Sequence, residues 1–393
     1  MKSPINIELA KEVLALEPSV PKGELPLGAP AASLEFEFRG RKVVSFSSWD
    51  VFGISTRRDL RQSVVSAVDT YGWGGGVARP WGGNYPDLIR AEARVAQFLG
   101  GETGTFFGTK NQSVLSCITT LFSEGDLIIL PSLTHAPVVD AAALVGAEVL
   151  FADSPSDPRI IDKMRGRRRV GLFIETTCLA SGESQSLADW LRLAEANDLW
   201  VILDESASLG VSGLRGAGSA DIFPWHLRLV ARIAPLSFVA ALSGCVIVGS
   251  KELRSLFLAR SRYLRCEPAE PPALLRAIPT VIDYLESAVT ARDSLLLRAK
   301  ALRVSLDAQG WNTLGGVESP LLCISVDSFR SAQLLSDALF QRGHLLEAVS
   351  AKVRGRDGGI VRILLSTGHS ALHTDALLES FRVIRERVTS AGV

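Results

Sequence analysis

The sequence predicts an α/β protein with a large, mostly parallel sheet covered by helices, followed by a smaller C-terminal α+β domain. Short, continuously apolar runs recur between residues 104 and 248, and helix-length segments separate them. This alternation is typical of parallel strands buried on both faces of a sheet. A long helical tract at about 272–309 then leads to a second, shorter set of strand and helix patterns. These observations predict two units around separate sheets.

The elements follow in order along the chain. Residues 1–56 indicate an N-terminal arm with a helix at 5–16 and an alternating strand at 34–38. The large domain is expected at 57–285, with strands at 104–107, 127–130, 148–151, 170–174, 199–203, 229–233 and 245–248. The small domain is expected at 286–393, with strands at 321–326 and 361–365 and helices at 330–342 and 371–390.

Composition excludes several classes of function. Lys+Arg and Asp+Glu are both 42 among 393 residues, so no net field attracts nucleic acid or an anionic membrane. The five cysteines are scattered without CxxC spacing, which argues against a disulfide framework and a zinc site. Residues 1–25 match neither a signal peptide nor a membrane span. We expect a cytoplasmic protein without a membrane segment or bound metal.

Candidate functional residues follow the strands, because ligands of such sheets bind at the carboxyl ends of the strands. Asp204 ends the run 200–203 and could hold a protonated ring nitrogen, although Asp there is as often a cap or a turn residue. His135 follows the run 127–130 and could stack on a planar ligand or be structural.

Two further features strengthen the prediction of a site. Arg362 lies inside an apolar strand, where an unpaired guanidinium is costly and a bidentate carboxylate partner is favoured. The glycine-rich run 71–83 lacks P-loop spacing, so it indicates close backbone approach and no nucleotide site.

Taken in order, these residues resemble the α-oxoamine synthases, which include serine palmitoyltransferase and 8-amino-7-oxononanoate synthase, over roughly residues 45–390. The matching motifs are Tyr71-Gly-Trp-Gly with Arg79 and Gly83, Glu92, His135-Ala-Pro, Asp204-Glu-Ser-Ala-Ser-Leu-Gly and Arg362-Ile-Leu-Leu-Ser-Thr-Gly-His369.

The resemblance implies the aminotransferase-like fold type I, a dimer, and an acyl thioester and an amino acid as substrates. It also implies that His135 and Asp204 contact pyridoxal phosphate. Arg362 would bind a carboxylate, and the turn at Gly108 would cradle the phosphate.

The sequence departs from the family at the lysine that binds the cofactor. Counting six residues back from Gly244 reaches Phe238, and no lysine lies between Lys163 and Lys251. Other family ligands are also replaced, by Ala207, by Pro235 and by Glu267 or Pro268. We therefore expect no covalently bound pyridoxal phosphate and leave non-covalent binding open.

Lys110 lies in the turn that resembles the phosphate cradle. A solvated lysine at a helix start is one interpretation; a cation for another anion, such as a coenzyme A phosphate, or a displaced catalytic amine is the other. We count Lys110 and Arg79 with Arg362 as substrate-binding candidates.

Three functions remain open. The first is the lysine-less subunit of a serine palmitoyltransferase-like heterodimer that pairs with a lysine-bearing homologue; the resemblance is closest to this branch. The second is a stand-alone, pyridoxal-phosphate-independent homodimeric enzyme that acts on an acyl thioester of coenzyme A or a carrier protein. His135 would be its general acid or base and Asp204 or Glu205 would orient it. The third is a non-catalytic binding or scaffold protein.

Overall fold

Each strand of the large domain divides its side chains between two layers of helices. The computed structural model describes residues 4–15, 33–131, 136–179, 181–184, 186–223, 227–316, 319–353 and 356–390. Its main sheet has the order β3-β9-β8-β7-β6-β4-β5. The strands are β3 (Thr103–Phe107), β4 (Leu127–Leu130), β5 (Glu148–Phe151), β6 (Val170–Glu175), β7 (Trp200–Asp204), β8 (Leu229–Pro235) and β9 (Cys245–Gly249).

The main sheet is parallel except for β9, which pairs antiparallel with both of its neighbours. On β4, Leu127 and Ile129 pack into one apolar cluster, and Ile128 and Leu130 pack into another. This alternation follows from the two-residue period of a strand. The predicted fold class is confirmed.

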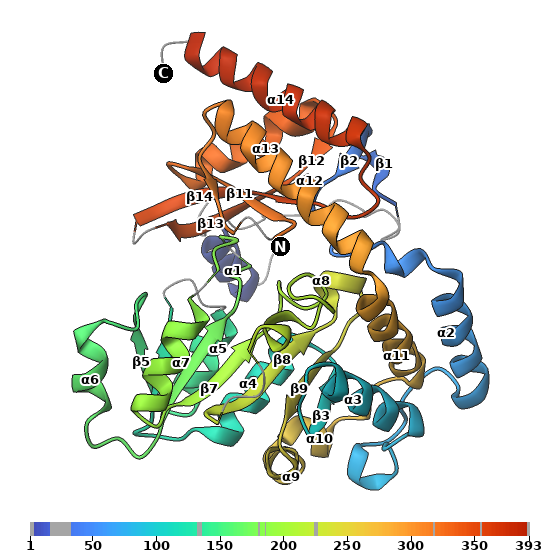
Figure 1. The fold of residues 1–393 in the computed structure, drawn as a ribbon, viewed down its shortest axis with the longest axis vertical. Helices are drawn as coiled ribbons and strands as arrows, with labels where there is room; N and C mark the ends of the chain where they lie inside the picture. Colours follow the sequence, from blue (N-terminus) through green and yellow to red (C-terminus); the bar gives the residue numbers. More distant parts are fainter. Residues whose placement is uncertain are drawn as a thin grey trace.

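Helices cover both faces of this sheet (Figure 1). Those of the large domain are α2 (Arg58–Tyr71), α3 (Pro86–Phe98), α4 (Lys110–Leu121), α5 (Ala136–Leu144), α6 (Pro158–Met164), α7 (Leu187–Ala196), α8 (Ser237–Ala240), α9 (Lys251–Arg260), α10 (Arg262–Cys266) and α11 (Pro272–Ser287), with short turns η1 (Ile54–Thr56), η2 (Arg79–Trp81) and η3 (Gly218–Asp221). Apolar residues of α4, α5 and α9 share a cluster with one sheet face, and those of α6 and α7 share a cluster with the other.

The small domain is built on a four-stranded sheet of order β10-β11-β14-β13. Its elements are α12 (Val289–Ala308), β10 (Thr313–Leu314), β11 (Leu321–Val326), α13 (Phe329–Gln341), β12 (His344–Leu345), β13 (Glu347–Val353), β14 (Arg356–Leu364) and α14 (Ala371–Ser390). The predicted helical tract is two helices, because α11 ends at Ser287 and α12 begins at Val289.

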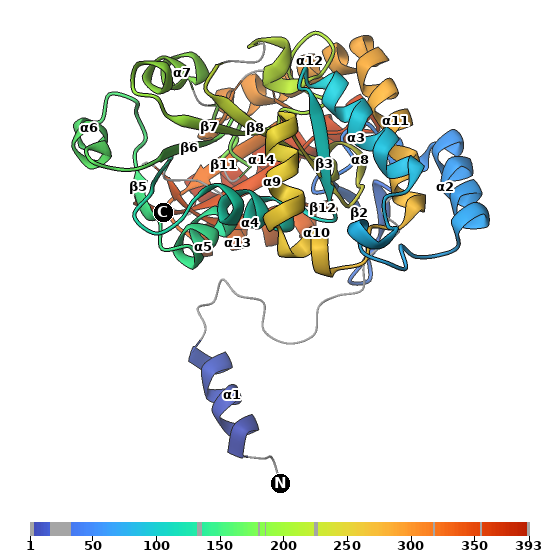
Figure 2. The ribbon, with the colours of Figure 1, turned by 90° about the horizontal axis from the view of Figure 1, so that it is seen from below.

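The N-terminal arm is only partly separate. Strands β1 (Glu35–Phe38) and β2 (Arg41–Ser45) form a three-stranded sheet with β12, so this part of the arm belongs structurally to the small domain. Helix α1 (Pro4–Ala15) lies away from the body (Figure 2).

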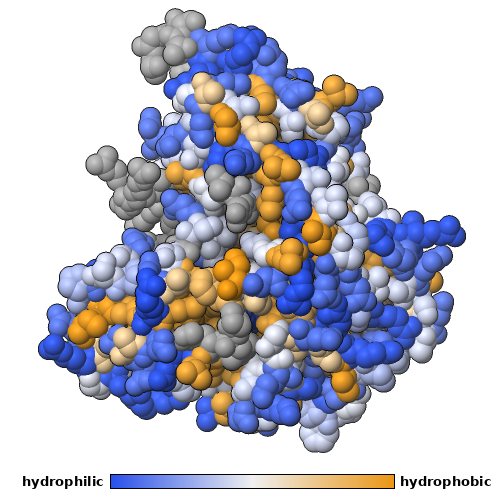
Figure 3. All heavy atoms as spheres, viewed as in Figure 1, coloured by the Kyte–Doolittle hydropathy of each residue, from blue (hydrophilic) through white to orange (hydrophobic). Residues whose placement is uncertain are grey.

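The surface mixes residue types. Hydrophobic residues are interspersed with hydrophilic ones on the face shown in Figure 3. Within the described ranges, every helix falls short of the length and apolarity needed to cross a membrane.

Candidate functional site

Asp204 lies at the centre of the candidate site. It is the last residue of β7 and its side chain is fully buried. One carboxylate oxygen accepts hydrogen bonds from the backbone N–H of Ser206, at 2.9 Å, and from the Ser206 hydroxyl. The other oxygen, Oδ2, lies 2.7 Å from the Lys110 ammonium. A cation therefore already sits at the position where Asp204 was predicted to hold one.

Strand parity explains why Asp204 and Lys110 meet. Ile202 of β7 packs into the cluster formed with α4, and Asp204, two residues later, points to the same side. Lys110 is the first residue of α4, whose N-cap is Thr109. Both residues are predictable from the sequence as strand and helix ends, but their pairing is not.

The environment of Lys110 keeps it charged. Burial lowers the pKa of this amine, but the charges of Asp204 and Glu175 more than offset burial, so the pKa is raised above its ordinary value. Only 13% of the Lys110 side chain is exposed. The interpretation of Lys110 as a solvated lysine is therefore wrong.

Glu205 points to the opposite side of the sheet from Asp204. Its carboxylate lies 2.9 Å from the Arg232 guanidinium, and it accepts hydrogen bonds from the hydroxyls of Ser208 and Ser219. Both members of the ion pair are at most 1% exposed. Glu205 is thus held in a buried network, and this corrects its predicted role of orienting a base in the pocket.

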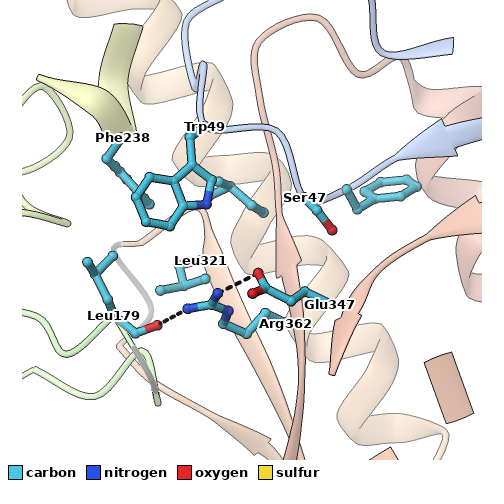
Figure 4. A pocket seen from close by; sticks show the side chains of 9 residues that line it. Ser47, Trp49, Leu179, Phe238, Leu321, Glu347 and Arg362 are labelled. Atoms are coloured by element: carbon cyan, nitrogen blue, oxygen red, sulfur yellow. Dashed lines mark hydrogen bonds and ion pairs between the residues drawn. The ribbon is translucent and has the colours of Figure 1, made fainter. Parts of the chain in front are cut away.

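Phe238 and Arg362 line one small cavity between the domains (Figure 4). Phe238 belongs to α8, is 2% exposed, and lies edge-on to Trp49 with ring centroids 6.5 Å apart. The cavity measures about 10 Å³, room for about one water molecule. An aromatic side chain therefore lines this cavity at the sequence position where the family motif has a lysine.

Arg362 already has two partners. Its guanidinium donates a hydrogen bond of 2.9 Å to the Leu179 carbonyl and pairs with the Glu347 carboxylate. A carboxylate of the same chain thus contacts this guanidinium, through Nη2 alone, and binding of a ligand carboxylate by Arg362 stays a prediction. Glu347 was not singled out in the sequence, because its cross-strand register with Arg362 is a property of the folded hairpin.

A second carboxylate stands beside the turn at Gly108. Tyr263 donates a hydrogen bond to Glu270, and a Cβ atom placed on Gly108 would overlap the Glu270 carboxylate. Burial and the charge of Glu270 raise the pKa of Tyr263. Glu267, which the resemblance places with Pro268 where the family has a phosphate ligand from across the subunit interface, is exposed, and its approach to a partner's phosphate stays a prediction. The loop between α10 and α11 brings Glu270 to the turn.

The other residues singled out in the sequence have different outcomes. Arg79 is buried and pairs with Glu92 at 2.5 Å, and it also donates a 3.0 Å hydrogen bond to Asn84. Its guanidinium is thus occupied by structural partners, which corrects its prediction as a substrate ligand. His135 lies outside the described residues. Ala207 is buried, and Pro235 is the last residue of β8.

Among the described residues, no group of three or more His, Cys, Asp or Glu side chains could hold a metal ion. The five cysteines, all within the described residues, form no disulfide; Cys266 is exposed and the other four are buried.

Comparisons with known proteins show the family and the fold to which this site belongs. The model of the aminotransferase class I and II family matches residues 82–380. The chain is 26% identical to 8-amino-7-oxononanoate synthase of Alkaliphilus oremlandii over 93% of both chains. It shares the fold of Sphingomonas wittichii serine palmitoyltransferase, with a TM-score of 0.86 at 21% identity, over 99% of this chain and 98% of that one. The S. paucimobilis enzyme with bound PLP and myriocin is similar, with a TM-score of 0.87 at 18% identity, over 99% and 98%.

These findings confirm the resemblance to the α-oxoamine synthases and the type I fold. They contradict the expectation of no covalently bound pyridoxal phosphate, because the family and the similar proteins indicate pyridoxal-phosphate-dependent enzymes. The expectation came from Phe238 and from the replaced ligands at Ala207, Pro235 and Glu267 or Pro268, whereas the family match spans residues 82–380. They also argue against the pyridoxal-phosphate-independent alternative.

The residues around Asp204 fit the ring end of this cofactor. Asp204 is fully buried, and its Oδ2 faces the Lys110 ammonium at 2.7 Å. A protonated ring nitrogen supplies the same charge, provided that the Lys110 ammonium moves aside. The Lys110 side chain is unbranched and reaches the site from the start of a helix, so rotation about its own bonds can release Asp204.

Proposed function

Because this chain belongs to the aminotransferase class I and II family, we propose that it is the subunit without the usual lysine in a serine palmitoyltransferase-like enzyme that condenses an acyl thioester with an amino acid. The observation that carries the proposal is the combination of Phe238 and Asp204. Phe238, which the spacing of the motif aligns with the family lysine, is buried, whereas Asp204 keeps a buried carboxylate paired with a cation. The pocket retains the charge for a ring nitrogen and has a carbon side chain in place of the amine.

Each retained residue has a role in this proposal. Pyridoxal phosphate, when bound, supplies an electron sink for a carbanion at the amino-acid α-carbon. Asp204 would keep the ring nitrogen protonated, since an unpaired buried carboxylate is costly and a cationic partner removes that cost. Arg362 would face the amino-acid carboxylate from the small domain.

The amine that binds the cofactor then has two sources. One is Lys110, whose Nζ atom lies 2.7 Å from Asp204. The other is a lysine of a homologous partner subunit. The similarity to serine palmitoyltransferases supports a dimeric arrangement, and the Phe238 position favours a partner that carries its own lysine.

The test begins with purification of the tagged chain from its native host. We expect a lysine-bearing homologue to co-purify, and the pair to release thiol from an acyl-CoA only when an amino acid is present. After supply of pyridoxal phosphate and borohydride reduction, peptide mass spectrometry locates the labelled lysine, at Lys110 or in the partner. Asp204→Asn should abolish turnover, and Asp162→Asn, an exposed aspartate with 75% side-chain exposure, is the control. A homodimer that condenses both substrates by itself would overturn the heterodimer.

A further inference from the structure

Glu347 and Arg362 face each other on neighbouring strands of the small domain. Strands β13 and β14 pair antiparallel, and their register places Glu347 directly opposite Arg362. Residues opposite each other in such a pair lie close enough for their side chains to interact. The contact is therefore set by the sheet and not by a chance rotamer of a long side chain.

The two members of this pair differ in exposure. Arg362 is 15% exposed and also donates to the Leu179 carbonyl, whereas the Glu347 side chain is 46% exposed. Figure 4 shows the guanidinium between Leu179 and Glu347, with both contacts drawn. The buried member is thus the arginine, and the carboxylate approaches it from the more open side.

The remaining wall leaves little space for a second carboxylate. Phe46, Trp49, Phe238 and Leu321 contribute apolar surface to the same cavity, which holds about 10 Å³. A ligand carboxylate must therefore take the place of the Glu347 carboxylate on the guanidinium. It must compete with a group that is attached to the same sheet and so has a high effective concentration.

We infer that Glu347 determines the specificity of the Arg362 site, by occupying the carboxylate position itself and selecting against ligands that bring only a carboxylate. The inference rests on the proposed function in placing Arg362 in the amino-acid pocket. It adds that Glu347 must leave the guanidinium before an amino-acid substrate binds there, so that it lowers the affinity of this chain for amino acids, and that one substitution raises that affinity.

The test measures binding and needs neither turnover nor a partner. L-alanine and L-alaninamide, which lacks the carboxylate, are titrated by calorimetry into the full-length chain and into Glu347→Gln. We expect Glu347→Gln to bind L-alanine roughly tenfold or more tightly than the unchanged chain, because the competing charge is gone. L-alaninamide should not gain. Adding Arg362→Gln to Glu347→Gln should abolish the gain.

Glu379→Gln is the matched control, since Glu379 also pairs with an arginine, Arg382, but on the exposed surface of α14. It should leave both titrations unchanged. Equal or tighter binding of L-alanine by the unchanged chain, or an equal gain for L-alaninamide, would overturn the inference. Failure to find a lysine-bearing partner would overturn the proposed function alone.

Discussion

The buried pair of Lys110 and Asp204 provides the sharpest test of the site geometry, through the substitution Lys110→Met. At 2.7 Å and an effective dielectric near 20, the attraction between the two charges is about 6 kcal/mol before desolvation is counted. Methionine keeps much of the length and volume of the side chain but removes the charge. Asp204 then remains fully buried with no cation beside it, so we expect a loss of about 3–5 kcal/mol in the free energy of unfolding.

The assay is urea denaturation of Lys110→Met, Asp204→Asn and the double variant. The double variant should be more stable than the sum of the single losses predicts, because neither charge is left unpaired. Lys163→Met is the matched control: Lys163 pairs with Glu148 at 2.5 Å, but its side chain is 50% exposed. Such surface pairs contribute about 0–1 kcal/mol. Equal losses for Lys110→Met and Lys163→Met would refute the buried pair.

Three other predictions concern stability, thiol reactivity and the phosphate turn. Burial lowers the pKa of His369 to about 4, below its value of about 6.5 in the unfolded chain, so the unfolded state takes up the proton first. The free energy of unfolding should therefore fall by up to roughly 3 kcal/mol as the pH drops from about 6.5 toward 4. In His369→Gln this dependence of the unfolding free energy on pH should be weaker. In native protein one thiol per chain, Cys266, should react rapidly with Ellman's reagent, and Cys266→Ser should remove that phase; two fast thiols would contradict the burial of the other four. Glu270→Gln should tighten binding of pyridoxal phosphate about tenfold in an absorbance titration, because it removes a negative charge beside Gly108; an equal effect of Glu252→Gln, at an exposed position, would show that the change is not local.

Much of the fold follows from local sequence patterns. The strands of the main sheet lie within two residues of their expected bounds, and the apolar run 127–130 matches β4 completely. Runs this apolar leave no exposed face, so their burial on both sides is predictable. The small domain was harder, because β13 carries no such run: only its residues 349–353 alternate between apolar and polar, and it joins the sheet by pairing with β14.

Some residues of the candidate site were also predictable from the sequence, and others were not. Asp204 and Arg362 were predictable from the sequence, since one ends an apolar strand and the other interrupts one. Their partners were not, because Lys110 is 94 positions from Asp204 in the chain and Glu347 meets Arg362 only through strand register. The loop between α10 and α11 is another example, because its path places the carboxylate of Glu270 beside Gly108 and leaves Glu267, three positions earlier, exposed.

The sequence by itself thus determined the resemblance to the family and the parallel sheet, because these depend on residue order and local period. Only the tertiary structure decided that Asp204 and Arg362 each already hold an opposite charge from the same chain. The physical reason is that burial demands compensation for every charge, and the nearest compensating group is chosen by packing in space and not by position along the chain.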